Sequence, residues 1–310
     1  MNFVWFEDFL ALAGSGSFSR AAEQRHSSQP AFSRRIRALE DWLGTPLIDR
    51  SAQPVQLTEA GVWFRGVAQD LVQRTQRLPS QAQQVAEANT GRLRMAATHA
   101  LSFAFWPRWL RSLEGVMASV SASGSALGPV ELISDVLARC ETLMAEGRVD
   151  FVLSHAHATA PTSLDADAAL SVQVGVDALV PVSAPARDGA PQYRLDTTGT
   201  PSPLLGYSDV SGLGRILRAV LGQRLQALDA SSVFTAHLAS VLRSMALDGR
   251  GVAWLPRSLL DEDLADQRLV LATDDTRWQV PLTIRLYRPP VLANRTVQAF
   301  WQAAQARVLS

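Results

Sequence analysis

The chain has 310 residues, of which 47% are hydrophobic, and its 29 basic residues balance 29 acidic ones. The length predicts two or three compact units. The hydrophobic content excludes a generally disordered chain, and the neutral charge by itself indicates no nucleic-acid partner. The one cysteine, Cys140, excludes an internal disulfide and fits a reducing compartment.

The N-terminal segment is acidic where a secretory signal is basic, and no apolar run approaches the roughly 20 residues that cross a bilayer. We therefore expect a cytoplasmic protein without a membrane partner. All 29 basic residues are arginines, so contacts with phosphate or carboxylate groups must use guanidinium or backbone N–H groups.

Three short helices are expected at the start of the chain. The first covers residues 4–13, where apolar residues recur on one helical stripe. The second, over 18–24, can be capped by the side chain of Ser17. The third opens at residue 28 and carries Pro30 in its first turn, where a missing N–H costs little.

Two short strands and a long helix are expected next. Residues 46–49 and 55–57 read as strands on either side of a turn, and residues 58–88 read as one helix. Large apolar residues recur along this helix at seven-residue spacing, at Phe64, Leu71, Leu78 and Val85. Such a narrow seam favours pairing with the same helix of a second copy, and ordinary packing within the chain is the alternative. Pro79 predicts a kink.

From residue 92 onward the pattern changes to strands that alternate with helices, which is typical of an open α/β sheet. The expected strands cover 92–97, 117–122, 149–154, 171–182, 203–206, 230–235, 252–255, 268–272 and 280–287. The expected helices cover 101–113, 131–146, 211–225, 236–249, 256–261 and 292–307.

Three short helices followed by a two-stranded wing are the layout of a winged helix-turn-helix domain, whose third helix enters the major groove of DNA. The side chains of Gln29 and Arg34 can read base edges, and three further arginines suit the phosphate backbone. The predicted DNA-contacting residues are Ser28, Gln29, Pro30, Ser33, Arg34, Arg35, Arg37 and Arg50. The alternative for the arginine cluster is a solvated helix face.

A strong resemblance to the N-terminal domain of the LysR-type transcriptional regulators is carried by the stretch GSFSRAAEQRHSSQPAFSRRIRALEDWLGTPLIDR. The run SQPAFSRRIRALE, followed by LTEAG at 57–61, is specific for that family. MALDGRGVAWLP at 245–256 resembles a helix–turn–strand near the end of the family's effector domain. Most members carry apolar residues where this chain has Arg25 and Ser27.

The resemblance implies a division of the chain into three parts. Residues 1–58 would form the winged helix-turn-helix domain, 59–90 a linker helix that pairs in a dimer, and 91–310 an effector domain. That domain would have the α/β fold of the periplasmic binding proteins, with a small molecule or ion bound between two lobes. The first lobe would hold 92–167 and 268–310, and the second 168–267.

Within the family, the hypochlorite-responsive subgroup is the most similar one, through the stretches THALSFAFWP, LLGYSDVSGLGRIL and MALDGRGVAWLP. We therefore expect the effector to be an anion or an oxidant-derived species. The resemblance implies that the partners are double-stranded DNA, this effector and further copies of the chain in a dimer or tetramer, with RNA polymerase as a further candidate.

Effector contacts are expected where strands end and helices begin, because the free N–H groups there can bind an anion. The residues predicted to contact the effector are Thr98, His99, Ser102, Ser154, His155, Tyr207, Ser208 and Thr235. Simple helix capping is the alternative for each of them.

Catalytic, metal and redox sites are not expected. The sequence has no nucleophile elbow, phosphate loop or metal-ligand set, so we predict no catalytic residue and no cofactor. The pair His155 and His157 is only half of a metal site. Cys140 falls on an apolar helical stripe, which predicts a core thiol with a raised pKa. The alternatives are an enzyme or a small-molecule binding protein on the same two-lobed fold.

Overall fold

The computed structural model of the chain describes residues 2–51, 54–87, 92–120, 128–167, 170–195, 202–228, 232–292 and 294–307. Two compact units divide it, Met1–Ala82 and Gln83–Ser310. None of the helices within the described ranges is long and apolar enough to span a membrane.

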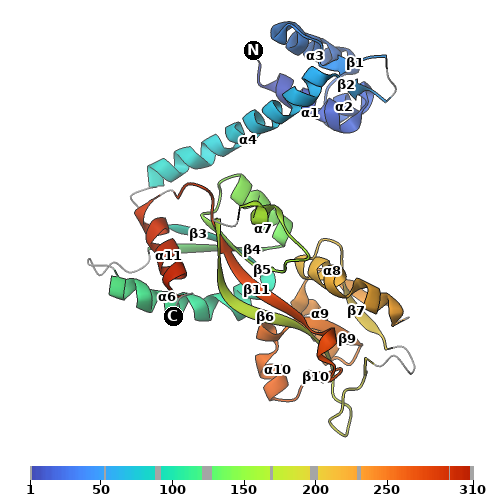
Figure 1. The fold of residues 1–310 in the computed structure, drawn as a ribbon, viewed down its shortest axis with the longest axis vertical. Coiled ribbons are helices and arrows are strands. Elements are labelled where there is room, and N and C mark those ends of the chain that lie inside the picture. The colour runs from blue at the N-terminus through green and yellow to red at the C-terminus, as the bar shows by residue number, and fades with distance from the viewer. Residues whose placement is uncertain are drawn as a thin grey trace. The chain divides into compact units, whose positions relative to one another are not determined.

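The first unit contains the three short helices, the two-stranded wing and the long helix that the sequence predicts (Figure 1). Their bounds are α1 (Val4–Ser15), α2 (Phe18–Gln24), α3 (Gln29–Leu43), β1 (Ile48–Asp49), β2 (Gln56–Leu57) and α4 (Glu59–Glu87). α1 extends past the expected residue 13 because Gly16, with φ of 63°, supplies the left-handed residue that ends it. As predicted, the Ser17 side chain caps α2 by accepting a hydrogen bond from the Arg20 N–H. α4 is helical on both sides of Pro79.

Phe64 belongs to the core of the first unit. Its side chain is buried, and its ring centroid lies 5.2 Å from that of Phe9 and 5.7 Å from that of Phe6. The prediction that Phe64 is exposed on the helix seam was therefore wrong, since aromatic rings of α1 cover it. Leu71 and Leu78 are 38% and 57% exposed, as a pairing surface requires. The side chain of Val85, the last residue of the predicted seam, lies outside the described residues.

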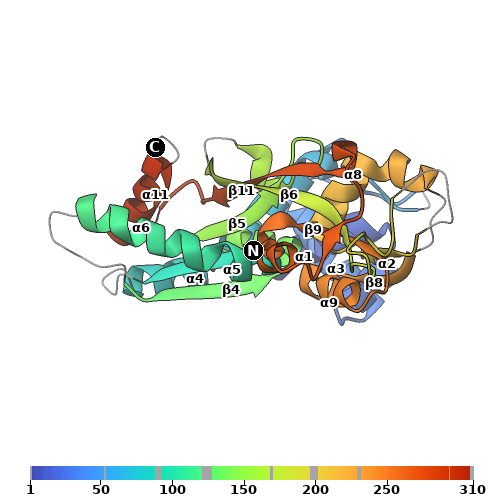
Figure 2. The same ribbon diagram turned by 90° about the horizontal axis from the view of Figure 1, so that it is seen from below.

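The second unit is built on one mixed sheet. Its strands are β3 (Leu93–Thr98), β4 (Val130–Asp135), β5 (Phe151–Ala156), β6 (Ser171–Ser183), β7 (Leu204–Tyr207), β8 (Ser232–Ala236), β9 (Val252–Pro256), β10 (Val270–Leu271) and β11 (Val280–Tyr287). The strand order is β4–β3–β5–β11–β6–β9–β7–β8, and β10 pairs with β6. The long antiparallel strands β6 and β11 run between a parallel group around β3 and a parallel group around β7 (Figures 1 and 2).

Helices cover both faces of the sheet. They are α5 (His99–Ala104), α6 (Trp106–Val120), α7 (Leu137–Ala145), α8 (Gly212–Ala227), α9 (Ala239–Leu247), α10 (Asp261–Ala265) and α11 (Arg295–Ala306). Alternate residues of β3 pack into different clusters: Met95 joins side chains of α6 and α11, whereas Ala96 joins side chains of α7. This alternation of side chains along a strand places α7 on the opposite face from α6 and α11.

Two predicted elements were wrong. The expected strand at 117–122 is helical to residue 120, where α6 ends, and residues 121–122 lie outside the described ranges. The expected helix at 131–146 begins instead as strand β4, which pairs in parallel with β3 from Val130 to Asp135. Pairing with a neighbouring strand overrides the helical pattern of this segment.

The cores of the second unit follow the two-lobed organisation. One cluster joins β3, β5 and β11 to α6 and α11, and another joins β6, β7 and β9 to α8 and α9. Leu269, Ala272 and Trp278 pack in the second of these clusters. The chain therefore returns to the first lobe within β11, later than the expected residue 268.

Candidate functional site

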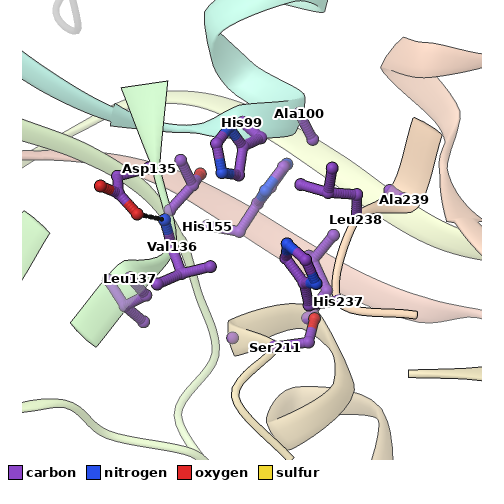
Figure 3. Close-up of a pocket in the computed structure, with 13 residues that line it drawn as sticks. His99, Ala100, Asp135, Val136, Leu137, His155, Ser211, His237, Leu238 and Ala239 are labelled. Carbon is purple, nitrogen blue, oxygen red and sulfur yellow. Dashed lines mark hydrogen bonds between the residues drawn. The ribbon is translucent and has the colours of Figure 1, made fainter. Parts of the chain in front are cut away.

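A pocket lies where strands of both lobes end and helices begin (Figure 3). Its lining residues are Thr98, His99, Ala100, Asp135, Val136, Leu137, His155, Ser211, Gly212, Leu213, His237, Leu238 and Ala239. Its cavity volume is about 40 Å³. One buried water needs roughly 10–15 Å³ of such space, so the pocket suits a small ligand.

Besides the short α5, which opens at His99, three longer helices begin at this pocket. The residues that precede their first turns, Val136 for α7, Ser211 for α8 and Leu238 for α9, all line it. Val136 and Leu238 have no side chain that caps the helix, so first-turn N–H groups of α7 and α9 stay available to a ligand. Because the N-terminus of a helix carries partial positive charge, the three helices together favour a bound anion.

Histidine side chains from separate elements surround the same space (Figure 3). His99 Nδ1 lies 2.9 Å from Ser134 Oγ. Burial lowers the pKa of His99, the carboxylate of Asp135 opposes this shift, and His237 adds to it. The protonation of His99 therefore depends on the charges that lie beside it in the pocket.

The third pocket histidine, His155 on β5, is tied to a carboxylate behind it. His155 Nε2 lies 3.0 Å from Asp177 Oδ2, and both side chains are almost fully buried. Asp177 on β6 also accepts a 2.6 Å hydrogen bond from Ser258 Oγ, in the turn after β9. Burial by itself would raise the pKa of Asp177. The hydrogen bond and the charge of His155, together with the hydrogen bond from Ser258, outweigh burial, so the pKa of Asp177 is lowered. The pocket wall is thus connected to a segment of the second lobe.

Of the eight residues predicted to contact the effector, Thr98, His99 and His155 line this pocket together. The hydroxyl oxygen of Thr98 is buried and has no hydrogen-bond partner among the described residues. Thr98 is therefore a pocket-lining residue whose hydroxyl is left unpaired.

The other five predicted residues do not line the pocket. Ser102 Oγ donates to the Thr98 carbonyl oxygen at 3.3 Å, and Tyr207 donates its hydroxyl proton to the Trp254 carbonyl oxygen at 2.9 Å. Ser154 is fully buried within β5, and Thr235 is exposed on β8. Ser208 follows β7 with a buried hydroxyl. Sequence alone does not show which face of a strand or helix presents each side chain.

The pocket residues Asp135, Val136 and Leu137 were not predicted from the sequence. They join β4 to α7, a junction hidden by the wrong prediction of a continuous helix at 131–146. A signal for Ser211 was present, because a serine before a predicted helix is a common N-cap.

The described residues hold no group of three or more histidine, cysteine, aspartate or glutamate side chains that could bind a metal ion. Cys140 is fully buried, and burial, with a smaller contribution from Asp135, raises the pKa of its thiol to about 12. It is the core thiol that the sequence predicted, since a protonated thiol is a poor nucleophile.

The start of α3 is open to solvent in the first unit. Ser28, Gln29, Pro30, Arg34 and Arg37 are exposed, and Ser33 is partly exposed. Neither Arg34 nor Arg37 forms an ion pair with another described residue. This surface can therefore present amide, hydroxyl and guanidinium groups to a nucleic acid.

Two of the predicted DNA-contacting arginines have carboxylate partners. Arg50 lies 2.6 Å from Glu40 Oε2, and Glu40 Oε1 accepts hydrogen bonds from the backbone N–H groups of Leu47 and Ile48. Arg35 is paired with the buried Asp8 of α1. Arg50 is thus fixed beside the wing, whereas Arg35 is directed toward α1.

Family comparisons cover both units. Residues 3–62 match the bacterial regulatory helix-turn-helix protein family of lysR type, and residues 86–308 match the LysR substrate binding domain. The chain belongs to the LysR family of transcriptional regulators. LysR-type regulators are not enzymes, and this chain combines their DNA-binding helix-turn-helix with their effector-binding domain.

Individual LysR-type proteins are similar over nearly the whole chain. The regulator YjiE of Escherichia coli is 30% identical over 299 residues, which cover 96% of this chain and 92% of YjiE. The structure of DarR from Vibrio fischeri in complex with DNA is 28% identical, with a TM-score of 0.57 and 99% of each chain covered. The hypochlorite-specific regulator HypT of Salmonella typhimurium is 28% identical, with a TM-score of 0.57 and coverage of 100% of this chain and 98% of HypT.

Proposed function

We propose that this LysR-type regulator binds a specific DNA sequence through α3 and that a small anion or oxidant-derived species, bound in the pocket between the lobes, sets its activity. The observation that carries the proposal is the start of α7, α8 and α9 at one small pocket that also holds His99 and an unpartnered threonine hydroxyl. These groups are hydrogen-bond donors or sources of positive potential.

The pocket favours an anion of low charge. First-turn N–H groups and the Thr98 hydroxyl donate to it, and a protonated His99 adds positive charge. Asp135 is the acidic residue in the lining, and one of its oxygens accepts a hydrogen bond from the Val136 N–H at 2.7 Å. Because that carboxylate repels negative charge, a monovalent anion should bind better than a divalent one.

The DNA-reading residues proposed are those on the open face of α3. Gln29, Ser33 and Arg34 read base edges, and Arg37 and Arg50 contact phosphates. The similarity to DarR, which was solved in complex with DNA, supports this use of the domain.

Pairing of α4 with a second copy is proposed from its exposed apolar side chains. Leu71 and Leu78 are seven residues apart, so they lie on the same side of α4, and both are exposed. A stripe of this kind on a helix normally finds a partner. Val62 and Trp63, which are 55% and 67% exposed on the same helix, lie on other sides of it. Val62 and Trp63 were not part of the seam predicted from the sequence. A homodimer, with pairing of dimers into a tetramer, is the proposed assembly, and the cytoplasm the proposed location.

Membership of the hypochlorite-responsive subgroup is the finer proposal. It is supported by the likeness to HypT, whose name describes it as hypochlorite-specific. In this chain the signal would act through the pocket rather than through Cys140, because that thiol is buried and protonated.

Thermal unfolding with chloride, nitrate, sulfate or hypochlorite at constant ionic strength tests the proposal. A monovalent anion should raise the melting temperature of the second unit and change the affinity for DNA selected from a random pool. If no anion or oxidant alters either quantity, the proposed effector class is wrong.

A further inference from the structure

One buried carboxylate links the three helices of the helix-turn-helix. Asp8 on α1 is fully buried, and its Oδ1 accepts a 3.1 Å hydrogen bond from Arg25 Nε, in the residue that ends α2. Its Oδ2 accepts a hydrogen bond from Arg35 Nε on α3. Arg25 also pairs with Glu7, the neighbour of Asp8 on α1. The four charged side chains therefore form a neutral cluster that spans α1, α2 and α3.

The cluster holds Arg35 in place more firmly than its neighbours on α3. Removing one partner from a buried ion pair leaves an uncompensated buried charge, which is strongly unfavourable. The Arg35 side chain is only 28% exposed, and its guanidinium carbon lies 5.9 Å from the centroid of the Phe32 ring. Arg34 and Arg37, on the same helix, are exposed. Arg35 is thus an arginine of the recognition helix that the fold withholds from solvent.

Withholding an arginine matters for a protein that must tell one DNA sequence from another. Contacts with phosphates add affinity for every sequence alike, whereas contacts with base edges discriminate. A free Arg35 would raise the affinity for non-operator DNA as well as the affinity for the operator. Its phosphate contacts would also favour positions of α3 along the DNA other than the one that the base contacts select.

We propose that Asp8 is a specificity-determining residue for DNA recognition. Through its ion pairs with Arg25 and Arg35 it keeps the Arg35 guanidinium off the phosphate backbone and fixes α3 against α1 and α2. Arg35, which the sequence placed among the phosphate contacts, is a positioning residue in this arrangement. The inference depends on DNA binding by the first unit and is independent of which effector the pocket takes.

The test is the salt dependence of DNA binding by the full-length protein. Asp8→Asn keeps the shape of the side chain and removes the charge that holds Arg35. Each phosphate contact changes the slope of log K against log salt by about 0.9. The Asp8→Asn slope should therefore be steeper by about one per protomer on operator and random DNA, with a several-fold smaller ratio of operator to random affinity. Adding Arg35→Gln to Asp8→Asn should return the slope to the wild-type value.

The single variants Arg35→Gln and Arg37→Gln complete the design. Arg35→Gln alone should leave the slope within about half a unit of wild type, whereas Arg37→Gln, as the matched control on the exposed face, should flatten it by about one per protomer. Flattening by Arg35→Gln in the wild-type background would overturn the proposal, because Arg35 would then already contact phosphate. An Asp8→Asn protein that melts earlier but keeps the wild-type slope would overturn it as well. If circular dichroism shows Asp8→Asn to be unfolded, the comparison of Arg35→Gln with Arg37→Gln decides the matter alone.

Discussion

Replacing Thr98 by valine should change stability and effector affinity in opposite directions. The hydroxyl oxygen of Thr98 is buried without a hydrogen-bond partner among the described residues. A buried polar group left unpaired costs about 1–3 kcal/mol, and valine has nearly the same shape without the hydroxyl. Thr98→Val should therefore raise the free energy of unfolding of the second unit by about 1 kcal/mol. That gain corresponds to a melting temperature about 2–4 °C higher for a unit of this size.

We expect the same hydroxyl to donate to an anion in the pocket, because Thr98 lines the pocket. A hydrogen bond to a charged group contributes about 1.5–3 kcal/mol, and each 1.4 kcal/mol is about a tenfold change in affinity. Thr98→Val should therefore weaken binding of the anion roughly 10- to 150-fold.

Scanning calorimetry and isothermal titration with chloride or nitrate measure the two effects separately. Ser102→Ala is the matched control, because the Ser102 hydroxyl donates to the Thr98 carbonyl oxygen and lies outside the pocket lining. It should leave anion affinity unchanged and lower stability by roughly 1 kcal/mol, the net value of one hydrogen bond. A Thr98→Val protein that binds the anion as wild type does would refute the role of this hydroxyl.

Four further predictions follow from the structure. Leu71→Asp should sediment as a monomer, whereas Phe64→Ala should lower the stability of the first unit by about 3–5 kcal/mol; a dimeric Leu71→Asp protein would disprove the α4 pairing. Arg34→Ala should cost roughly 1–3 kcal/mol of operator binding and relax the preference at one base position, and an unchanged preference would exclude base reading. Burial lowers the pKa of His99, and a bound anion favours its protonated form. Anion affinity should therefore increase as pH falls from about 7.5 to 5.5, and His99→Asn should flatten this dependence; affinity that decreases in acid would contradict it. Because the pKa of Cys140 is raised to about 12, iodoacetamide should label the thiol at neutral pH only after denaturation, and rapid labelling of the native protein would contradict its assignment to the core.

The first unit was predictable because local signals decide it. A serine cap, a proline in a first turn and stripes of apolar residues bound its helices, and α2 spans Phe18–Gln24 as expected. Strand β11 also has the expected bounds, 280–287. In contrast, Phe64 and Leu71 share one seven-residue pattern, and only the distant rings of α1 make Phe64 a core residue.

The candidate site was predictable only in part, because its walls depend on contacts between distant segments. Thr98 and His99 follow a clear strand, and the turn from strand to helix identified them. The segment 131–146 reads as one helix, but parallel pairing with β3 makes its first residues part of β4, which covers Val130–Asp135. The junction at Asp135–Leu137, where α7 meets the pocket, therefore could not be found from the local pattern.

The central claim is that an anion in the pocket controls DNA binding. The most direct measurement is fluorescence anisotropy of a selected operator with wild type and Thr98→Val side by side, at constant ionic strength. Glutamate, a much larger anion than chloride or nitrate, serves as the background anion and is replaced stepwise by either of them. We predict that wild-type affinity for the operator changes by about fivefold or more and that Thr98→Val requires at least about tenfold more anion for the same response. Identical responses of the two proteins, or no response of the wild type, would contradict the claim.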